Sequence, residues 1–232
     1  PAERITSLSR ELGADLTVLG SHGESGMTAW NLGSTVQQVL AITRGSVFIA
    51  RSTSPVPRVV SPKRILVPLD GSLRTESVLP TVARLATVHD AEVLLVHVVL
   101  EPQPTAVLDG ADDLGLAHQL ASRMESGAKR YLERLRDQLA HEIAIVRTQV
   151  IRHPDERQSL LELSRKERID LVVLSAHGST CNPVRAFGSV AAHLLTHSKI
   201  PLFVLQDLPE PARPRVLEPG DEDEEAAPRL RA

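Results

Sequence analysis

The sequence has few of the residues that mark several classes of protein. It contains one cysteine, Cys181, in 232 residues, which excludes a disulfide framework within the chain and is typical of a reducing cytoplasm. Aromatic residues make up only 2% of the chain. The longest nearly apolar run, Ala91–Leu100, is too short to span a bilayer, and no signal peptide is visible. These absences favour a cytoplasmic location.

The composition that remains favours an aliphatic α/β core. Hydrophobic residues make up 42% of the chain, and with so few aromatics the core must consist of Val, Leu, Ile and Ala. Such a core suits parallel strands that helices cover on both faces. The formal net charge is −3, so the chain lacks the excess of positive charge that is typical of nucleic-acid-binding domains. We therefore expect no nucleic-acid partner.

Five short apolar runs after residue 60 predict β-strands. They are too continuous for strands exposed on one face and too short for ordinary helices. The runs are Arg64–Asp70, Glu92–Leu100, Ile143–Ile151, Asp170–Ala176 and Ile200–Gln206. Helix-like segments separate them, at Thr75–Val88, Ala117–Ala140, Gln158–Lys166 and Ser189–Thr196, with a kink expected at Pro80. The alternating order predicts an α/β fold of the Rossmann type, an open parallel five-stranded sheet with helices on both faces.

The chain contains part of this pattern twice. The segment ADLTVLGSHGESGMTAWNLGSTVQQVLAITRGSVFIARS, which ends at Ser52, matches Ile169–Asp207 at a constant offset of 155 residues. A constant offset over this length indicates a duplication. The offset pairs Asp15 with Asp170, His22 with His177, Gly23 with Gly178, Gly33 with Gly188, and Ser34 with Ser189.

The repeat predicts the domain organisation. Residues 1–52, the first copy, correspond to the C-terminal part of a domain and lack a counterpart of RILVPLDGS, whereas residues 63–207, the second copy, have all five strands. Because the chain does not begin with Met, we expect it to be a fragment of a longer tandem protein. Residues 53–62 contain three prolines and read as a linker. Residues 208–232 are expected to form a disordered acidic, Pro-rich tail, and Glu101–Leu116 a mobile excursion.

The repeated glycines resemble the signature of the universal stress protein family. That signature is Gly, two residues, Gly, nine residues, Gly, then Ser or Thr. The first copy has it whole, and the second has Ser175 in the place of the first glycine. The segments ILVPLDGS and LLVHVV also look like the family's first two strands. The positions are Gly20, Gly23, Gly33 and Ser34 in the first copy, and Ser175, Gly178, Gly188 and Ser189 in the second.

The resemblance implies a fold like that of the adenine nucleotide α-hydrolases and a cytoplasmic stress-response module that binds ATP or a related adenine nucleotide, with Mg²⁺ as the accompanying ion. In a doubly wound sheet, ligands bind beyond the carboxyl ends of the strands, and a helix N-terminus offers N–H groups to an anion. Gly178, Gly188 and Ser189 are therefore expected to hold phosphate beside Ser175. By resemblance, Asp70 would face the adenosine end and the backbone at Val98 would meet the adenine.

Other interpretations remain open from the sequence. Asp70 and Gly71 are common turn residues, and Gly188-Ser189 is also an ordinary helix start. Ser175 adds a β-carbon where the backbone would approach a ligand. The alternative function is a nucleotide-independent scaffold that dimerises or binds a partner. The resemblance implies that the final strand pairs with its equivalent, either in a homodimer or within the chain. An ATP-hydrolysing enzyme is the least supported function, because no catalytic base is evident.

The histidines and the cysteine do not predict a metal or redox site. His22 and His177 occupy equivalent positions, but neither has further ligands at suitable spacing, which favours a role in stabilising the turn. His193 and His197 lie one helical turn apart without an evident third ligand, which favours a solvated helix face. Cys181 has no nearby base or resolving cysteine. The sequence therefore predicts no metal site and no catalytic residues.

Overall fold

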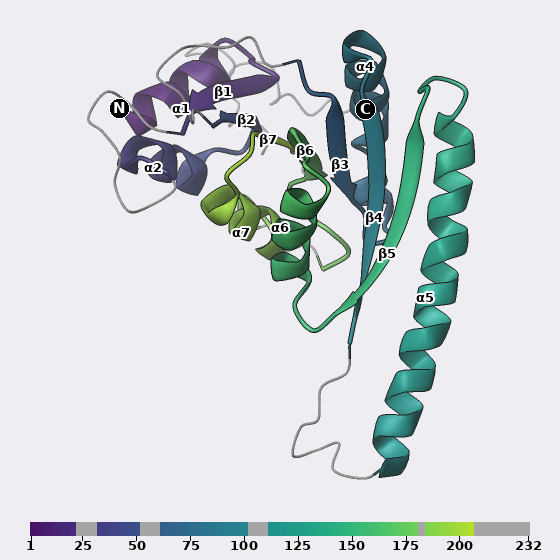
Figure 1. Ribbon diagram of the computed structural model, residues 1–232. Helices are drawn as coiled ribbons and strands as arrows, with labels where there is room; N and C mark the ends of the chain where they lie inside the picture. The colour runs from purple at the N-terminus through teal and green to yellow at the C-terminus, as the bar shows by residue number, and fades with distance from the viewer. Residues whose placement is uncertain (22–31, 52–60, 102–110, 181–183, 207–232) are drawn as a thin grey trace, which may run out of the picture.

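Seven strands form one mixed sheet in the computed structural model, which describes residues 1–21, 32–51, 61–101, 111–180 and 184–206. The strand order is β1-β2-β7-β6-β3-β4-β5 (Figure 1). The strands are β1 (Leu16–Gly20), β2 (Ser46–Ala50), β3 (Arg64–Pro68), β4 (Glu92–Leu100), β5 (Val146–His153), β6 (Leu171–Ser175) and β7 (Leu202–Leu205). The predicted linker lies almost wholly outside the described residues, and the predicted acidic tail lies entirely outside them.

Five of these strands form the parallel sheet that the sequence predicts. β7, β6, β3, β4 and β5 all belong to the second copy and pair in parallel. Two further strands from the first copy extend this sheet, so the whole sheet is mixed and seven-stranded rather than parallel and five-stranded. The reason is that β1 pairs in parallel with β2, and β2 pairs with the edge strand of the second copy.

The two copies meet through their last strands. β2 and β7 are antiparallel, with Val47 opposite Val204, Phe48 opposite Phe203 and Ile49 opposite Leu202. The two phenylalanine rings lie edge to face with centroids 6.0 Å apart, a favoured geometry for an aromatic pair. The pairing satisfies backbone groups that an isolated edge strand would expose. The strand pairing implied by the resemblance is thus present within this chain.

Equivalent residues of the two copies make equivalent backbone hydrogen bonds. The N–H of Ser21 donates to the carbonyl of Ala50 at 2.8 Å, and 155 residues later the N–H of Ala176 donates to Leu205 at 2.7 Å. The N–H of Gly33 donates to Ser21 at 2.7 Å, as that of Gly188 does to Ala176 at 2.7 Å. The repeated sequence therefore folds into a repeated local structure.

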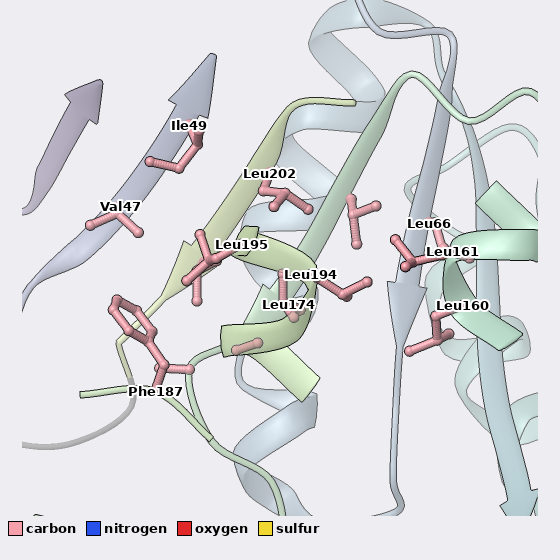
Figure 2. Close-up of a cluster of buried hydrophobic side chains, with 14 of the residues drawn as sticks. Val47, Ile49, Leu66, Leu160, Leu161, Leu174, Phe187, Leu194, Leu195 and Leu202 are labelled. Carbon is pink, nitrogen blue, oxygen red and sulfur yellow. The ribbon is translucent and has the colours of Figure 1, made fainter. Parts of the chain in front are cut away.

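Helices cover the sheet on both faces, as predicted. One face carries α2 (Ser34–Ile42), α6 (Glu156–Lys166) and α7 (Ser189–His197), and its core includes residues of both copies, such as Val47, Leu174 and Leu202 (Figure 2). The other face carries α4 (Leu79–His89) and α5 (Ala111–Leu139). α1 (Ala2–Glu11) packs against α2. No helix in the described ranges has the length and apolar character needed to span a membrane.

Three predicted boundaries differ from the structure. The helix expected over Thr75–Val88 is two helices, α3 (Leu73–Glu76) and α4. Pro80 lies in the first turn of α4, where a backbone N–H would have no partner within the helix, so the missing N–H of proline causes no kink. Residues 111–116, expected in a mobile excursion, begin α5. Ile143 precedes β5 rather than starting it, and is buried in the loop against the α4 and α5 face.

We expect the chain to self-associate through the free edge of β1. Among the described strands β1 has one neighbour, whereas its equivalent β6 has two and is buried throughout. Val18 of β1 is 62% exposed, and an apolar edge strand is a template for pairing with another chain. Light scattering of residues 1–232 should show oligomers that Val18→Lys reduces. A monodisperse monomer of the unmodified chain would contradict this prediction.

Candidate binding pocket at the strand ends

A pocket of about 330 Å³ lies at the carboxyl ends of β3 and β6. In the sheet β3 lies between β4 and β6. The chain passes from β3 to β4 and β5 on one side and returns to β6 and β7 on the other, so the direction in which strands are added reverses at β3. Ligands of doubly wound sheets bind at such a reversal. The pocket is lined by Pro68, Leu69, Asp70, Thr75, Leu100, Glu156, the segment 174–180 and the segment 188–191.

Five of the six residues predicted from the sequence line this pocket. They are Asp70, Ser175, Gly178, Gly188 and Ser189. Val98 does not line it; this residue lies in the ladder between β4 and β5, opposite Ile151. Leu100 lines the pocket instead, because it lies two residues further along β4 and so shares the face of Val98.

Asp70 is held by a dense set of hydrogen bonds. Its Oδ1 accepts from the N–H of Ser72 at 2.9 Å, the hydroxyl of Ser72 at 2.6 Å and the hydroxyl of Thr75 at 2.9 Å. Its Oδ2 accepts from the N–H of Ser179 at 2.6 Å. Asp70 therefore joins the turn after β3 to the loop after β6, across 109 residues of sequence.

These hydrogen bonds keep Asp70 ionised. Burial by itself would raise the pKa of the carboxyl group, but the donors on Ser72, Ser179 and Thr75 outweigh it and lower the pKa to about 2. Donors that bind the charged form stabilise it. At neutral pH the pocket therefore contains a fixed negative charge.

Two glycines permit this arrangement. Gly71, directly after Asp70, has φ +88°, a backbone conformation that glycine adopts at little cost. Gly178 brings the loop against Asp70, and a β-carbon at this position would collide with the Oδ2 atom of Asp70. The glycine at 178 thus allows the Ser179 N–H to reach the carboxylate.

Three side chains hold successive carbonyls of the loop between Gly178 and Gly188. Nη2 of Arg44 donates to the carbonyl of Val184 at 2.9 Å, and Nε2 of His177 lies 2.9 Å from the carbonyl of Arg185. Nε2 of Gln206 donates to the carbonyl of Ala186 at 3.2 Å. His177 is 2% exposed, which agrees with its predicted structural role. Arg44 belongs to the first copy, and no local pattern identifies its contact with the loop.

Ser175 is a buried polar residue at the pocket. The residue is 6% exposed, and its hydroxyl has no hydrogen-bond partner in the described part of the chain. Its first-copy equivalent is Gly20, the last residue of β1. The second copy therefore has a hydroxymethyl side chain at a position where the first copy has none.

Glu156 lines the pocket but was not identified from the sequence. It is the first residue of α6, next to Asp155, which caps the helix by accepting from the N–H groups of Arg157 and Gln158. Burial raises the pKa of Glu156, and the charges of Asp70 and Asp155 raise it further. Its proximity to Asp70 arises only from the tertiary fold.

The remaining candidate residues lie away from this pocket. Gly33 caps α2 and Ser34 begins it, while His22 and Gly23 lie outside the described residues. The first copy has no residue equivalent to Asp70. The rings of His193 and His197 stack with centroids 4.1 Å apart. Within the described ranges, no three His, Cys, Asp or Glu side chains form a metal-binding group, and Cys181 lies outside these ranges.

Comparison with known proteins connects these features to one family. The model of the universal stress protein family matches residues 1–51 and 62–206. The chain belongs to the universal stress protein family. Both copies take part in the match, so the family assignment covers the strands, the Asp70 turn and the glycine-containing loops.

Individual universal stress proteins resemble the chain at low identity. Universal stress protein MJ0577 of Methanocaldococcus jannaschii is 23% identical over 154 residues, which cover 62% of this chain and 94% of that protein. A universal stress protein from Archaeoglobus fulgidus has a TM-score of 0.57 and 20% identity, covering 90% of this chain and 67% of its own. UspA from Lactobacillus plantarum has a TM-score of 0.55 and 23% identity, covering 62% and 97% respectively. These structures support the α/β fold.

Proposed function

We propose that the second copy binds ATP or a related adenine nucleotide and acts as a regulatory module in the stress response. The observation that carries the proposal is the position of the pocket. It lies at the reversal of strand order and is lined by Gly178, Gly188 and Ser189, which the family signature contains. Membership of the family supports the same ligand class.

The start of α7 supplies donors for phosphate. Ser189–Ala191 form its first turn and line the pocket. The first N–H groups of a helix have no partner within the helix and attract anions. Ser189 is exposed at the same place, and its hydroxyl is a further potential donor. We therefore place the phosphates of the ligand at this turn.

The pocket supports binding better than catalysis. The Asp70 carboxylate already accepts four hydrogen bonds, and its low pKa makes it a poor proton acceptor at neutral pH. Mg²⁺ would accompany the nucleotide on its phosphates. We infer that the bound nucleotide acts as a regulator by stabilising one conformation of the loop between Gly178 and Gly188.

A nucleotide-independent scaffold is the second candidate function. It is favoured by the β2–β7 pairing, which joins the two copies through a continuous sheet and a shared core. On this hypothesis the joined copies bind a partner, and Asp70 has only its structural role between the turn and the loop.

ATP with Mg²⁺ is expected to raise the melting temperature of the protein, because a ligand that binds only the folded state stabilises it. Gly188→Val should abolish this increase, since a β-carbon at 188 would lie 3.3 Å from the carbonyl of Ala176 and the larger side chain would fill the start of α7. Asp70→Ala should abolish it as well. A chain whose melting temperature does not change in millimolar ATP would favour the scaffold.

Ser175→Gly is expected to tighten ATP binding about tenfold, or about 1.4 kcal/mol. The substitution restores the glycine of the signature and removes a buried hydroxyl that has no partner among the described residues. Isothermal titration calorimetry with ATP and Mg²⁺ measures the change. Weaker binding by the variant would show instead that the Ser175 hydroxyl contacts the ligand.

A further inference from the structure

We propose that Glu156 determines the charge of the ligand that the pocket accepts, favouring a nucleoside or a cation-complexed nucleotide over free nucleoside triphosphate. Glu156 is then a specificity-determining residue, which deepens the proposed function and rests on it. Three features of the described part of the chain support this role: the charges of the pocket wall, the surroundings of Glu156, and a Glu156 carboxylate that makes no contact of the fold.

The described wall of the pocket is acidic. It includes two carboxylates, Asp70 and Glu156, and no lysine or arginine among the described lining residues. A free triphosphate that enters this space brings several negative charges close to both carboxylates. Like charges in a partly buried site repel more strongly than they would in water. The donors at the start of α7 attract the phosphates but are neutral groups, so they offset only part of this repulsion.

Glu156 is partly buried and lies near two other carboxylates, those of Asp70 and Asp155. Burial and the charges of Asp70 and Asp155 raise the pKa of its carboxyl group, although Arg157 and the positive end of the α6 dipole act in the opposite direction. A ligand with further negative charge would be repelled by Asp70 and Glu156, which both line the pocket. A nucleoside carries no such charge, and a divalent cation lowers that of a nucleotide.

The carboxylate of Glu156 is available for this role. Within the described part of the chain it makes no hydrogen bond or ion pair, whereas the neighbouring Asp155 caps α6 and pairs with Arg157. Replacing Glu156 with glutamine therefore removes a charge without removing a contact of the fold. The substitution isolates the electrostatic effect of the side chain.

Calorimetric titration with three probes tests the inference: adenosine, ATP with Mg²⁺, and ATP with a chelator. The unmodified chain should bind chelated ATP about tenfold more weakly than ATP with Mg²⁺. Glu156→Gln should strengthen binding of chelated ATP about tenfold, equivalent to about 1.4 kcal/mol, and leave adenosine binding unchanged. Glu162→Gln is the matched control, because Glu162 lies on the same helix but does not line the pocket. Its carboxylate accepts a hydrogen bond from the side chain of Gln158.

The outcomes separate this inference from the function on which it rests. If Glu156→Gln changes adenosine and ATP affinity equally, or changes neither, the residue does not select by charge although the nucleotide site stands. If adenosine binding is lost in the variant, Glu156 contacts the nucleoside, and the inference is wrong. If no probe binds to any of the proteins, the proposed nucleotide function is refuted together with the inference.

Discussion

Gly178→Ala is expected to lower the free energy of unfolding by about 2–3 kcal/mol and to abolish ATP binding. The added methyl group would collide with the Oδ2 atom of Asp70, which accepts the Ser179 N–H at 2.6 Å. Asp70 cannot turn aside freely, because Ser72 and Thr75 hold its other oxygen. The substitution therefore breaks a charge-assisted hydrogen bond and moves the loop out of the pocket.

Chemical denaturation and calorimetry measure these two effects, and Gly127→Ala provides the control. Gly127 lies in α5, and a β-carbon there would meet no atom within 4 Å among its described surroundings. Alanine should therefore stabilise this helix by about 0.5–1 kcal/mol. If Gly178→Ala is as stable as the unmodified chain and still binds ATP, the close approach of Gly178 to Asp70 has no part in the site.

Val47→Asp is expected to separate the first copy from the second and to cost about 3–5 kcal/mol, the effect of an unpaired charge in a buried position. Val47 is fully buried on β2, opposite Val204 of β7, and belongs to the core that both copies share (Figure 2). Its charge cannot be solvated while the two strands remain paired. The parallel strands of the second copy do not include Val47, so they should persist.

Limited proteolysis tests this prediction, because residues 1–51 should become sensitive to cleavage while residues 62–206 stay resistant. Leu12→Asp is the control, since it introduces the same charge in the same copy at an apolar residue that is 73% exposed and lies outside β1. It should leave the proteolytic pattern unchanged. Equal sensitivity of both copies in Val47→Asp would show that the second copy depends on the first for its stability.

The second copy's strands could be predicted from the sequence because both of their faces are buried. Ile65, Leu66 and Val67 are successive fully buried residues of β3, and a short apolar run of β-branched and aliphatic residues is typical of a strand covered on both faces. The break between α3 and α4 was not predictable in the same way. It falls at Ser77, whose N–H donates to the carbonyls of Leu73 and Arg74 and whose hydroxyl donates to the carbonyl of Arg74.

Most of the candidate pocket also followed from local signals. Gly178, Gly188 and Ser189 were identified because the spacing of glycines recurs at a constant offset, and Asp70 because it ends a strand. Glu156 was missed, since nothing near it in the sequence distinguishes it from an ordinary first-turn carboxylate. Arg44 was missed because its contact with Val184 spans 140 residues.

The sequence by itself determined the local elements, the repeat and the glycines of the loops, because these depend on interactions between residues near one another in the chain or on periodic burial. Only the tertiary structure decided which charges share the pocket and that the last strands of the two copies pair within one chain. Asp70 and Glu156 become neighbours, and β2 becomes the antiparallel partner of β7, through contacts between distant segments. Such contacts form because they bury apolar side chains and pair the backbone N–H and C=O groups of edge strands. Many segments could meet either requirement, so the spacing of residues in the sequence does not identify which segment does.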